Sequence, residues 1–496
     1  DYNDADWRKL NLPHDWAIEG EFSKDNPSGT GGGALPGGIG WYRKTFTADK
    51  ADEGKRYRID FDGAYMNSTV YINGHELGTR PYGYISFSYD LTPYIKWGEE
   101  NVLAVRVDNA EQPNSRWYSG CGIYRNVWLT KLNPAHIAQW GTYVTAEDVS
   151  KNSAQLKIRT KLQYDAEAQM ADVVLQSRLV DADGNAVGEA VSEAQLMPLT
   201  PAEVEQEIHL KNPRLWSIDT PYMYRVESIL KDKQTGEVLD RYYTPTGIRT
   251  FRFDAQKGFI LNGEQVKING VCMHHDLGCL GAAVNTRAIE RQLEILKEMG
   301  CNGIRCSHNP PAPELLDLCD RMGFIVMDET FDMWRKKKTR HDYSRYFNEW
   351  HERDLTDLIV RDRNHPSVFG WSVSNEIMPI IRGVMRNAPG LEDNLVKHFK
   401  IWSDICFKYD PSRAWASADG EDDGRGLLPF YMVHYGGEGA MKRAYESGKP
   451  WGVGEACNAY YGTPEQVSNA AKDGGRAYRS FEGRMESVAV DAYNSL

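Results

Sequence analysis

Hydrophobic and polar residues alternate in short runs along the first quarter of the chain, and turn residues separate the runs. Residues 57–61 and 102–107 alternate in this way, and the run 69–72 leads directly into the hairpin signal Asn73-Gly74. Few helical stretches interrupt these runs. Many short strands with glycine-rich turns predict a jelly-roll β-sandwich for residues 1–132.

The next part of the chain keeps a strand pattern of a different style. Residues 155–160 and 173–177 read as strands, and Asp183-Gly184-Asn185 is a turn signal. A length near 110 residues fits an immunoglobulin-like β-sandwich, which we predict for residues 136–248. No residues suited to chemistry stand out here, so we interpret this domain as a spacer.

After about residue 254 the pattern changes to strands that alternate with helices. Helix patterns cover residues 286–299, before Gly300, and residues 312–322, before Gly323. The strands are short apolar runs, as in buried parallel sheets, at 266–273, 302–306, 324–328, 368–373, 413–417, 430–433 and 451–454. Seven such units predict a (β/α)8 barrel over residues 254–496. The eighth strand is not visible before Leu496, so we expect the barrel to be incomplete at its C-terminus.

Polar or ionisable residues follow every one of the seven predicted strands. Because active sites of such barrels lie at the C-terminal ends of the strands, a functional interpretation of the whole set is favoured over seven separate structural roles. The strands end, in order, at His274-His275-Asp276, Arg305 to Asn309, Asp328-Glu329, Asn375-Glu376, Asp419, His434-Tyr435 and Glu455.

Two carboxylates in this set are suited to glycoside hydrolysis. One carboxyl group protonates the leaving oxygen while the other attacks the anomeric carbon, and a retaining mechanism needs them about 5–5.5 Å apart. Glu376 and Glu455 end the fourth and seventh strands, 79 residues apart in the sequence. We therefore expect them to face each other across the barrel mouth.

Composition and charge exclude several other classes. The chain carries 58 lysines and arginines against 70 aspartates and glutamates, a net charge of −12, which argues against a nucleic-acid partner. Its eight cysteines form no CxxC pair, and no cluster has zinc spacing. No apolar run is long enough to span a membrane, and localisation stays open. The run Lys336-Lys337-Lys338 is interpreted as a solvated loop.

Several motifs resemble glycoside hydrolase family 2, and they keep the family order along essentially the whole chain. In the predicted barrel they are residues 371–376 (WSVSNE), 304–310 (IRCSHNP), 317–323 (DLCDRMG) and 327–329 (MDE). In the first domain they are residues 11–16 (NLPHDW), 40–43 (GWYR) and 116–125 (RWYSGCGIYR). The likeness implies a β-galactosidase-like enzyme, with a sugar-binding first domain and a catalytic barrel.

This resemblance implies roles for individual residues. Glu376 would be the general acid/base and Glu455 the nucleophile. Asn375 would bond the 2-hydroxyl of the sugar, His308 would bind or order the substrate, and Tyr435 would hydrogen-bond the nucleophile.

Further candidates follow from the same likeness. His434 is counted with the substrate-binding residues, and so is Asn114, which falls where some β-galactosidases carry a sugar-binding aspartate. His275 and Glu329 lie near a metal position of some members, although a structural role is at least as good an interpretation. No cofactor is required, and a structural or active-site cation stays open.

Electrostatics predict how two neighbouring carboxyl groups divide their tasks. Glu455 must be ionised to attack, and Glu376 must hold a proton. Like charges a few ångströms apart raise one pKa, so we expect the pKa of Glu376 to be raised.

The expected partner is an oligosaccharide or a polysaccharide-derived β-glycoside, and a homo-oligomer stays open. One alternative is a β-glucuronidase of the same family, although its usual Thr-Glu-Phe-Gly and Asn-x-Lys motifs are not found. Another is a non-catalytic carbohydrate-binding protein, because a barrel without its eighth strand would leave unpaired edges.

Overall fold

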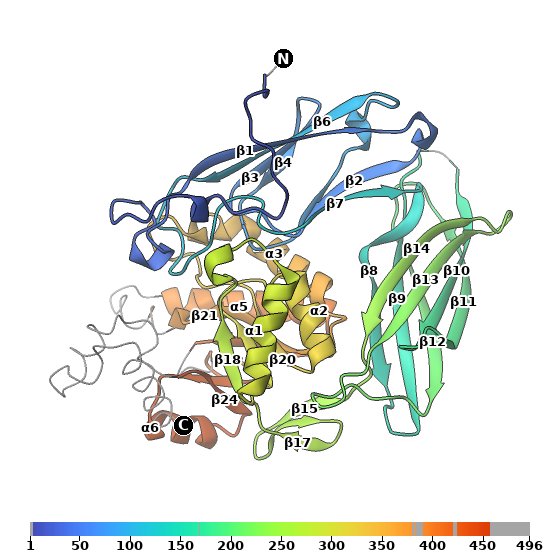
Figure 1. Cartoon of the computed structure of the whole chain (residues 1–496). Coiled ribbons are helices and arrows are strands. Elements are labelled where there is room, and N and C mark those ends of the chain that lie inside the picture. The colour runs from blue at the N-terminus through green and yellow to red at the C-terminus, as the bar shows by residue number, and fades with distance from the viewer. Residues whose placement is uncertain (1–2, 168, 379–380, 382–389, 420–423, 457–496) are drawn as a thin grey trace.

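The computed structural model describes residues 3–167, 169–378, 381, 390–419 and 424–456. Figure 1 shows three bodies: a first sandwich in blue at the top, a second in teal and green at the right, and a barrel in yellow to red below the first and beside the second. The predicted architecture of two β-sandwiches and a (β/α) barrel is confirmed.

The first sandwich packs two antiparallel sheets around one apolar core. Asn73 (φ 50°) and Gly74 (φ 87°) form the predicted hairpin turn, because both adopt the left-handed backbone that such turns need. The first sheet has the order β1 (Gly38–Thr47), β6 (Glu100–Asn109), β3 (Ser68–Ile72) and β4 (His75–Arg80). The second has the order β5 (Phe87–Asp90), β2 (Arg56–Phe61) and β7 (Val127–Leu132).

The second sandwich has seven strands in two antiparallel sheets. One sheet has the order β11 (Ala186–Leu196), β10 (Ala171–Val180), β13 (Tyr224–Asp232) and β14 (Val238–Thr246). The other has the order β12 (Ala202–Lys211), β9 (Ser153–Tyr164) and β8 (Ala135–Glu147). Alternate residues of β9 and β12 are buried between the sheets, as their period-two pattern predicts.

The described residues of the barrel form seven parallel strands in sequence order. Five form one sheet: β18 (Gly270–Met273), β19 (Gly303–Cys306), β20 (Ile325–Glu329), β21 (Val368–Asn375) and β22 (Ala414–Ala418). The last two, β23 (Tyr431–His434) and β24 (Trp451–Glu455), pair with each other. The described helices are α1 (Thr286–Glu298), α2 (Pro313–Met322), α3 (Phe347–Asp362), α5 (Leu391–Tyr409) and α6 (Glu438–Glu446). The expectation of a missing eighth strand concerns residues 457–496, which lie outside the described residues.

The first barrel strand is shorter than predicted. Residues 266–273 read as one strand, but β17 (Glu264–Val266) turns back antiparallel onto β16 (Gly258–Leu261), and only β18 joins the barrel. The hydrophobic pattern of the sequence does not show where one strand ends and the next begins within such a run. Together with β15 (Phe251–Asp254), this hairpin covers the N-terminal end of the barrel, where Phe253 lies 4.9 Å from Phe430 between ring centroids.

The first sandwich is fixed to the barrel by buried arginines. Arg125 donates to the backbone oxygens of Pro310 (2.8 Å) and Pro311 (3.1 Å), just after β19. Arg80 pairs with Asp354 (2.5 Å) and Asp357 (2.7 Å) of α3. The sandwich is therefore held at the side of the barrel where the strands end.

The second sandwich contacts a different part of the barrel. The Tyr143 hydroxyl donates to Asp410 (2.7 Å), which also accepts from Arg413 (2.7 Å) and the Trp371 indole (3.1 Å). Asn364 bonds the backbone of β8 at two points. These residues precede β21 and β22, so this domain contacts the barrel near the N-terminal ends of its strands.

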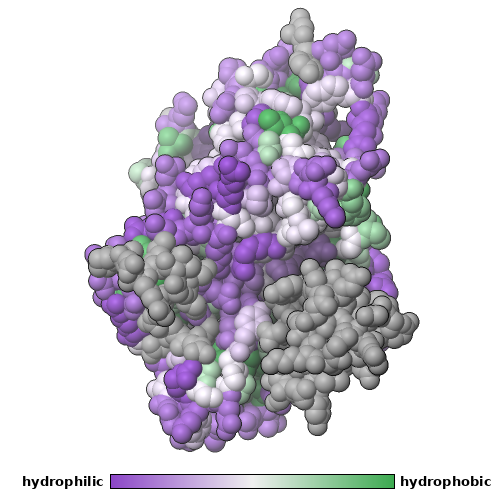
Figure 2. Space-filling view, turned by 90° about the vertical axis from the view of Figure 1, so that its left-hand side faces the viewer, coloured by the Kyte–Doolittle hydropathy of each residue, from purple (hydrophilic) through white to green (hydrophobic). Residues whose placement is uncertain are grey.

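No helix in the described part of the chain is both long enough and apolar enough to cross a membrane. Figure 2 shows one face of the molecule, on which hydrophilic residues dominate and hydrophobic ones form small, separate patches.

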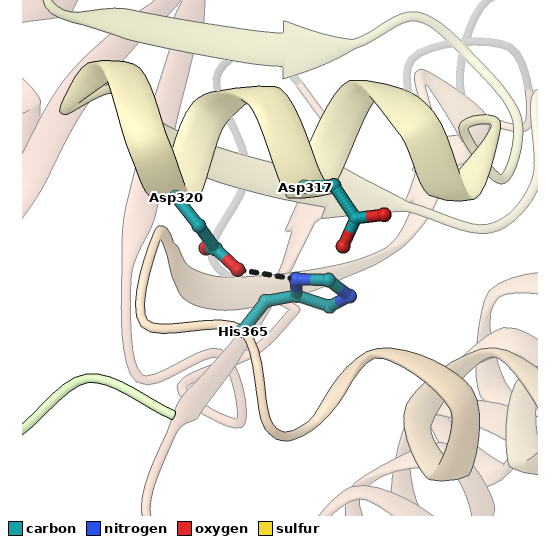
Figure 3. A group of neighbouring side chains, drawn as sticks. All are labelled: Asp317, Asp320 and His365. Carbon is teal, nitrogen blue, oxygen red and sulfur yellow. Dashed lines mark hydrogen bonds and ion pairs between the residues drawn. The ribbon is translucent and has the colours of Figure 1, made fainter. Parts of the chain in front are cut away.

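A charged pair joins α2 to the segment that precedes β21. Figure 3 shows Asp317 and Asp320 on one side of α2, both directed toward His365, with a hydrogen bond of 2.6 Å between Asp320 and His365 Nδ1. Burial lowers the pKa of His365, but the Asp320 carboxylate outweighs burial and raises that pKa to about 9.

This pair predicts a pH-dependent contribution to stability. The folded pKa of His365 lies above its unfolded value of about 6.5, so the contribution is complete below about pH 6.5 and is lost as pH rises through about 9. We expect His365→Gln to cost on the order of 2–3 kcal/mol at pH 6 and much less at pH 9.5. Thermal unfolding at both pH values measures this difference, with Asp317→Asn as the control that leaves the hydrogen bond intact. An equal loss at both pH values contradicts the prediction.

Candidate active site

The C-terminal strand ends bring the predicted residues together at one mouth of the barrel. One side-chain oxygen or nitrogen atom each of Glu376, His434 and Glu455 lie within 4.8 Å of one another. Glu376 directly follows β21, while His434 and Glu455 end β23 and β24. This gap between two carboxylates fits one sugar carbon with its leaving oxygen, and it agrees with the separation of a retaining site.

Two residues of the site have a backbone that is uncommon for side chains other than glycine. Glu376 (φ 47°) and Tyr435 (φ 49°) each directly follow a barrel strand and adopt the left-handed region. Backbone hydrogen bonds hold both: Glu376 N donates to Ala418 O (2.8 Å), and Tyr435 N donates to Glu455 O (2.9 Å). Such costly conformations persist where the surroundings enforce them, and they turn both side chains into the mouth.

Asp419 extends this support to the residues after Glu376. Its carboxylate accepts from the backbone N–H groups of Ile377 (2.6 Å) and Met378 (3.0 Å). The backbone of Glu376 and of the two residues after it is therefore held by the last residue of β22 and by Asp419, which follows that strand.

Glu455 lies among donors that stabilise its charged form. Arg305 Nη1 donates to one oxygen (2.6 Å), and the Tyr435 hydroxyl donates to the other (2.5 Å). Burial raises the pKa of Glu455, but Arg305, His434 and Tyr435 together outweigh burial and hold that pKa below its usual value. Glu455 is thus an ionised carboxylate at neutral pH, as a nucleophile requires.

The electrostatic expectation for Glu376 is wrong in direction. His434 Nδ1 lies 3.1 Å from Glu376 Oε1, and this hydrogen bond lowers the pKa of Glu376 to about 2 against the effect of burial. The positive charges of Lys338 and Arg116 lower the pKa of Glu376 further. The like charge of Glu455 is therefore outweighed by cations that come from other segments.

A buried arginine connects four of the site residues. Arg305 forms a bidentate pair with Glu329 (2.9 and 3.0 Å) and also donates to Glu455 and to Asn375 Oδ1 (2.8 Å). His308 lies beside them, with Nδ1 2.6 Å from Glu329 and Nε2 3.6 Å from Glu455. The sequence shows Arg305 only as part of a motif, and its contacts cross three strands.

The lysine run is not a purely solvated loop. Lys336 and Lys337 are exposed, but the side chain of Lys338 is 5% exposed. Lys338 Nζ donates to Asp332 (3.0 Å) and to the backbone oxygen of Asn375 (2.6 Å). The expectation for Lys338 is therefore wrong, because a buried carboxylate 6 residues away in sequence draws it inward.

Asn114 lies near the site but its polar atoms are engaged elsewhere. Its amide donates to Asn109 (2.6 Å) and to Glu111 O (2.9 Å), and it accepts from Tyr65 (2.9 Å). Asn114 lines a pocket that also includes Trp117, His308 and Asp332. In this structure it supports the wall of that pocket.

The two candidate metal residues contact protein groups in this structure. Glu329 is fully buried, and its oxygens accept from Arg305, His308 and the Ser372 hydroxyl (2.6 Å). His275 faces the backbone oxygen of Ser119 (3.2 Å), and burial lowers its pKa to about 3. Neither residue belongs to a group with metal-ligand spacing in the described ranges.

Comparisons with known proteins agree with the fold of two sandwiches and a barrel. Family models match three consecutive stretches: the sugar-binding domain of glycosyl hydrolases family 2 at 35–134, the family-2 domain at 135–249 and the family-2 TIM-barrel domain at 254–414. A β-galactosidase of Bacteroides ovatus is 62% identical over 435 residues, which cover 88% of this chain and 50% of that protein. A putative β-glucuronidase of Formosa agariphila is 42% identical over 75% of this chain and 35% of its own length.

A solved structure has the same fold. A family-2 member from Bacteroides cellulosilyticus superposes with a TM-score of 0.85 at 36% sequence identity, covering 96% of this chain and 60% of that one. The chain spans half or less of the length of the two curated relatives above.

Arg305 predicts a stability effect that does not depend on any activity. Arg305→Met would leave Glu329 and Glu455 without their shared cation, so we expect the barrel to lose about 3–5 kcal/mol of stability. Arg305→Lys keeps the positive charge but not the bidentate guanidinium geometry, so this variant should lose less stability. Denaturant unfolding followed through tryptophan fluorescence measures both variants. An Arg305→Met protein as stable as the wild type would contradict the prediction.

Proposed function

The chain belongs to glycosyl hydrolase family 2, and on this basis we propose that the protein is a retaining, exo-acting β-glycosidase, with β-galactosidase as the first assignment. The observation that carries the proposal is the pair of carboxylates Glu376 and Glu455, whose oxygens lie within 4.8 Å across the barrel mouth. Their separation leaves no room for the water that an inverting mechanism activates between substrate and base.

In the first step, Glu455 attacks the anomeric carbon and Glu376 protonates the glycosidic oxygen as that bond breaks. In the second step, Glu376 removes a proton from water, the water oxygen attacks the anomeric carbon, and Glu455 leaves as a carboxylate. Asn375 holds the 2-hydroxyl, a contact that strengthens in the transition state. Arg305 and Tyr435 stabilise Glu455 when its charge returns.

Glu376 must hold a proton before it can act as the acid. In the structure, the 3.1 Å hydrogen bond to His434 lowers the pKa of Glu376 to about 2. A sugar that displaces water from the mouth raises this pKa again, because loss of hydration disfavours the charged carboxylate. The proton then resides on Glu376, where the leaving oxygen takes it.

The sugar is assigned from similarity and from charge. The 62% identical relative is named a β-galactosidase, whereas the 42% identical relative is named a putative β-glucuronidase. A glucuronide is the second candidate because Arg116 and Lys338 place positive charge near Glu376. Both cations already pair with Asp332, which favours the neutral sugar.

The roles of the two carboxylates can be tested in the full-length protein. We expect hydrolysis of nitrophenyl β-galactoside ahead of the β-glucuronide and β-mannoside, with the β-anomer formed first in proton NMR. Glu376→Ala should lower kcat/KM by about 100-fold or more, and azide should rescue it to a β-glycosyl azide. Glu455→Ala should lose more activity and give the α-azide. Hydrolysis of none of the three glycosides, or a first-formed α-anomer, would refute the proposal; preference for the glucuronide would change only the sugar.

The contact between His434 and Glu376 predicts a change in the pH profile. His434→Gln removes the imidazole that lowers the pKa of Glu376, so this pKa should move up from about 2 toward its usual value. Because the acid must be protonated to act, we expect His434→Gln to shift the alkaline limb of kcat/KM to higher pH. An unchanged alkaline limb would show that His434 does not set the pKa of Glu376.

A further inference from the structure

We propose that Arg116 of the first sandwich is a positioning residue for the sugar site of the barrel. It acts through Asp332 on the side-chain amide of Asn375, and thereby sets the contact with the 2-hydroxyl of the substrate. The inference rests on the proposed function and adds two residues, Arg116 and Asp332, to the site.

The first link is an ion pair between the two domains. Arg116 donates to both oxygens of Asp332, through Nε at 2.9 Å and through Nη2. The residues are 216 positions apart in sequence, and the Asp332 side chain is 1% exposed. A bidentate pair of this kind fixes the angle of the carboxylate as well as its place.

The second link runs from Asp332 to the amide of Asn375. Asn375 Nδ2 donates to Asp332 Oδ1 (3.0 Å), and Asn375 Oδ1 accepts from Arg305 (2.8 Å). Rotating this amide by 180° would turn its oxygen toward a carboxylate and its N–H groups toward a guanidinium. Both contacts would be repulsive, so charge allows one orientation only. Asn375 is fully buried in the structure, and its second Nδ2 N–H is assigned to the 2-hydroxyl of the bound sugar.

Lys338 keeps this arrangement charged. Burial alone would raise the pKa of Asp332, but Lys338 and Arg116 outweigh burial and hold that pKa far below its usual value. Asp332 is consequently a carboxylate throughout the working pH range. The Asn375 amide therefore always faces an anion on one side and a cation on the other.

The loop that carries Arg116 is fixed by its own neighbours. The Ser115 hydroxyl donates to Trp117 O (2.6 Å), and the Trp117 indole donates to Tyr84 (3.1 Å). Trp117 also packs edge to face on His308, with 5.6 Å between ring centroids. The Arg116 side chain itself is 39% exposed, so its removal should leave the loop folded.

The test compares two substrates that differ in one hydroxyl group. In the full-length protein, we expect Arg116→Ala to lower kcat/KM for nitrophenyl β-galactoside by about 10- to 100-fold, as misplaced contacts do. For the 2-deoxy analogue, the same variant should lose less than about threefold, because the affected contact is absent. Arg116→Lys should recover part of the loss, and Asp332→Asn should reproduce the same substrate dependence. Combining Asn375→Ala with Arg116→Ala should add little to Asn375→Ala alone.

Arg345→Ala is the matched control, because Arg345 also pairs across the two domains, but its carboxylate partner is Glu111. It should leave both substrates unaffected. Equal losses of Arg116→Ala and Asp332→Asn on both substrates, or no loss on either, would overturn the inference while the wild type still hydrolyses glycosides. A wild type that hydrolyses neither galactoside nor glucuronide would overturn the proposed function and this inference together. If the glucuronide is preferred, the comparison uses the glucuronide and its 2-deoxy form.

Discussion

The buried guanidinium of Arg305 is the interaction on which the site depends. It is the cation shared by Glu329 of β20 and Glu455 of β24, and it also bonds Asn375 of β21. Burying two carboxylates without a cation would be very costly, and each would otherwise take up a proton. One charge on β19 therefore favours the ionised form of Glu455 and sets the direction of the Asn375 amide.

Most of the fold could be predicted because local pattern and global structure agree. Apolar runs between glycine-terminated helices identify the barrel strands, since parallel strands are covered on both faces. Gly300 and Gly323 end α1 and α2 with positive φ, as their positions predict. The division between β17 and β18 could not be predicted, because the choice of pairing partner depends on residues that are distant in sequence.

The candidate site was predictable only in part, for a related reason. Strand position is enough to select Glu376 and Glu455, since the topology brings strand ends together. The charge of Glu376 could not be predicted, because its pKa depends on a 3.1 Å contact with His434 of another strand. The burial of Lys338 could not be predicted for the same reason. A lysine side chain is buried only where a partner such as the Asp332 carboxylate pairs with it, and the sequence does not show that pairing.

The two sandwiches should consequently differ in their influence on the site. The second contacts the barrel through Tyr143 and Asp410, near strand N-termini and away from the mouth. The first contacts it through Arg80 and Arg125 and also sends Arg116 to Asp332. A small displacement of the first sandwich would alter the hydrogen bonds of Asp332, and through them the amide of Asn375. A similar displacement of the second sandwich would reach the site only by shifting residues of the barrel interior, and close packing there resists such shifts.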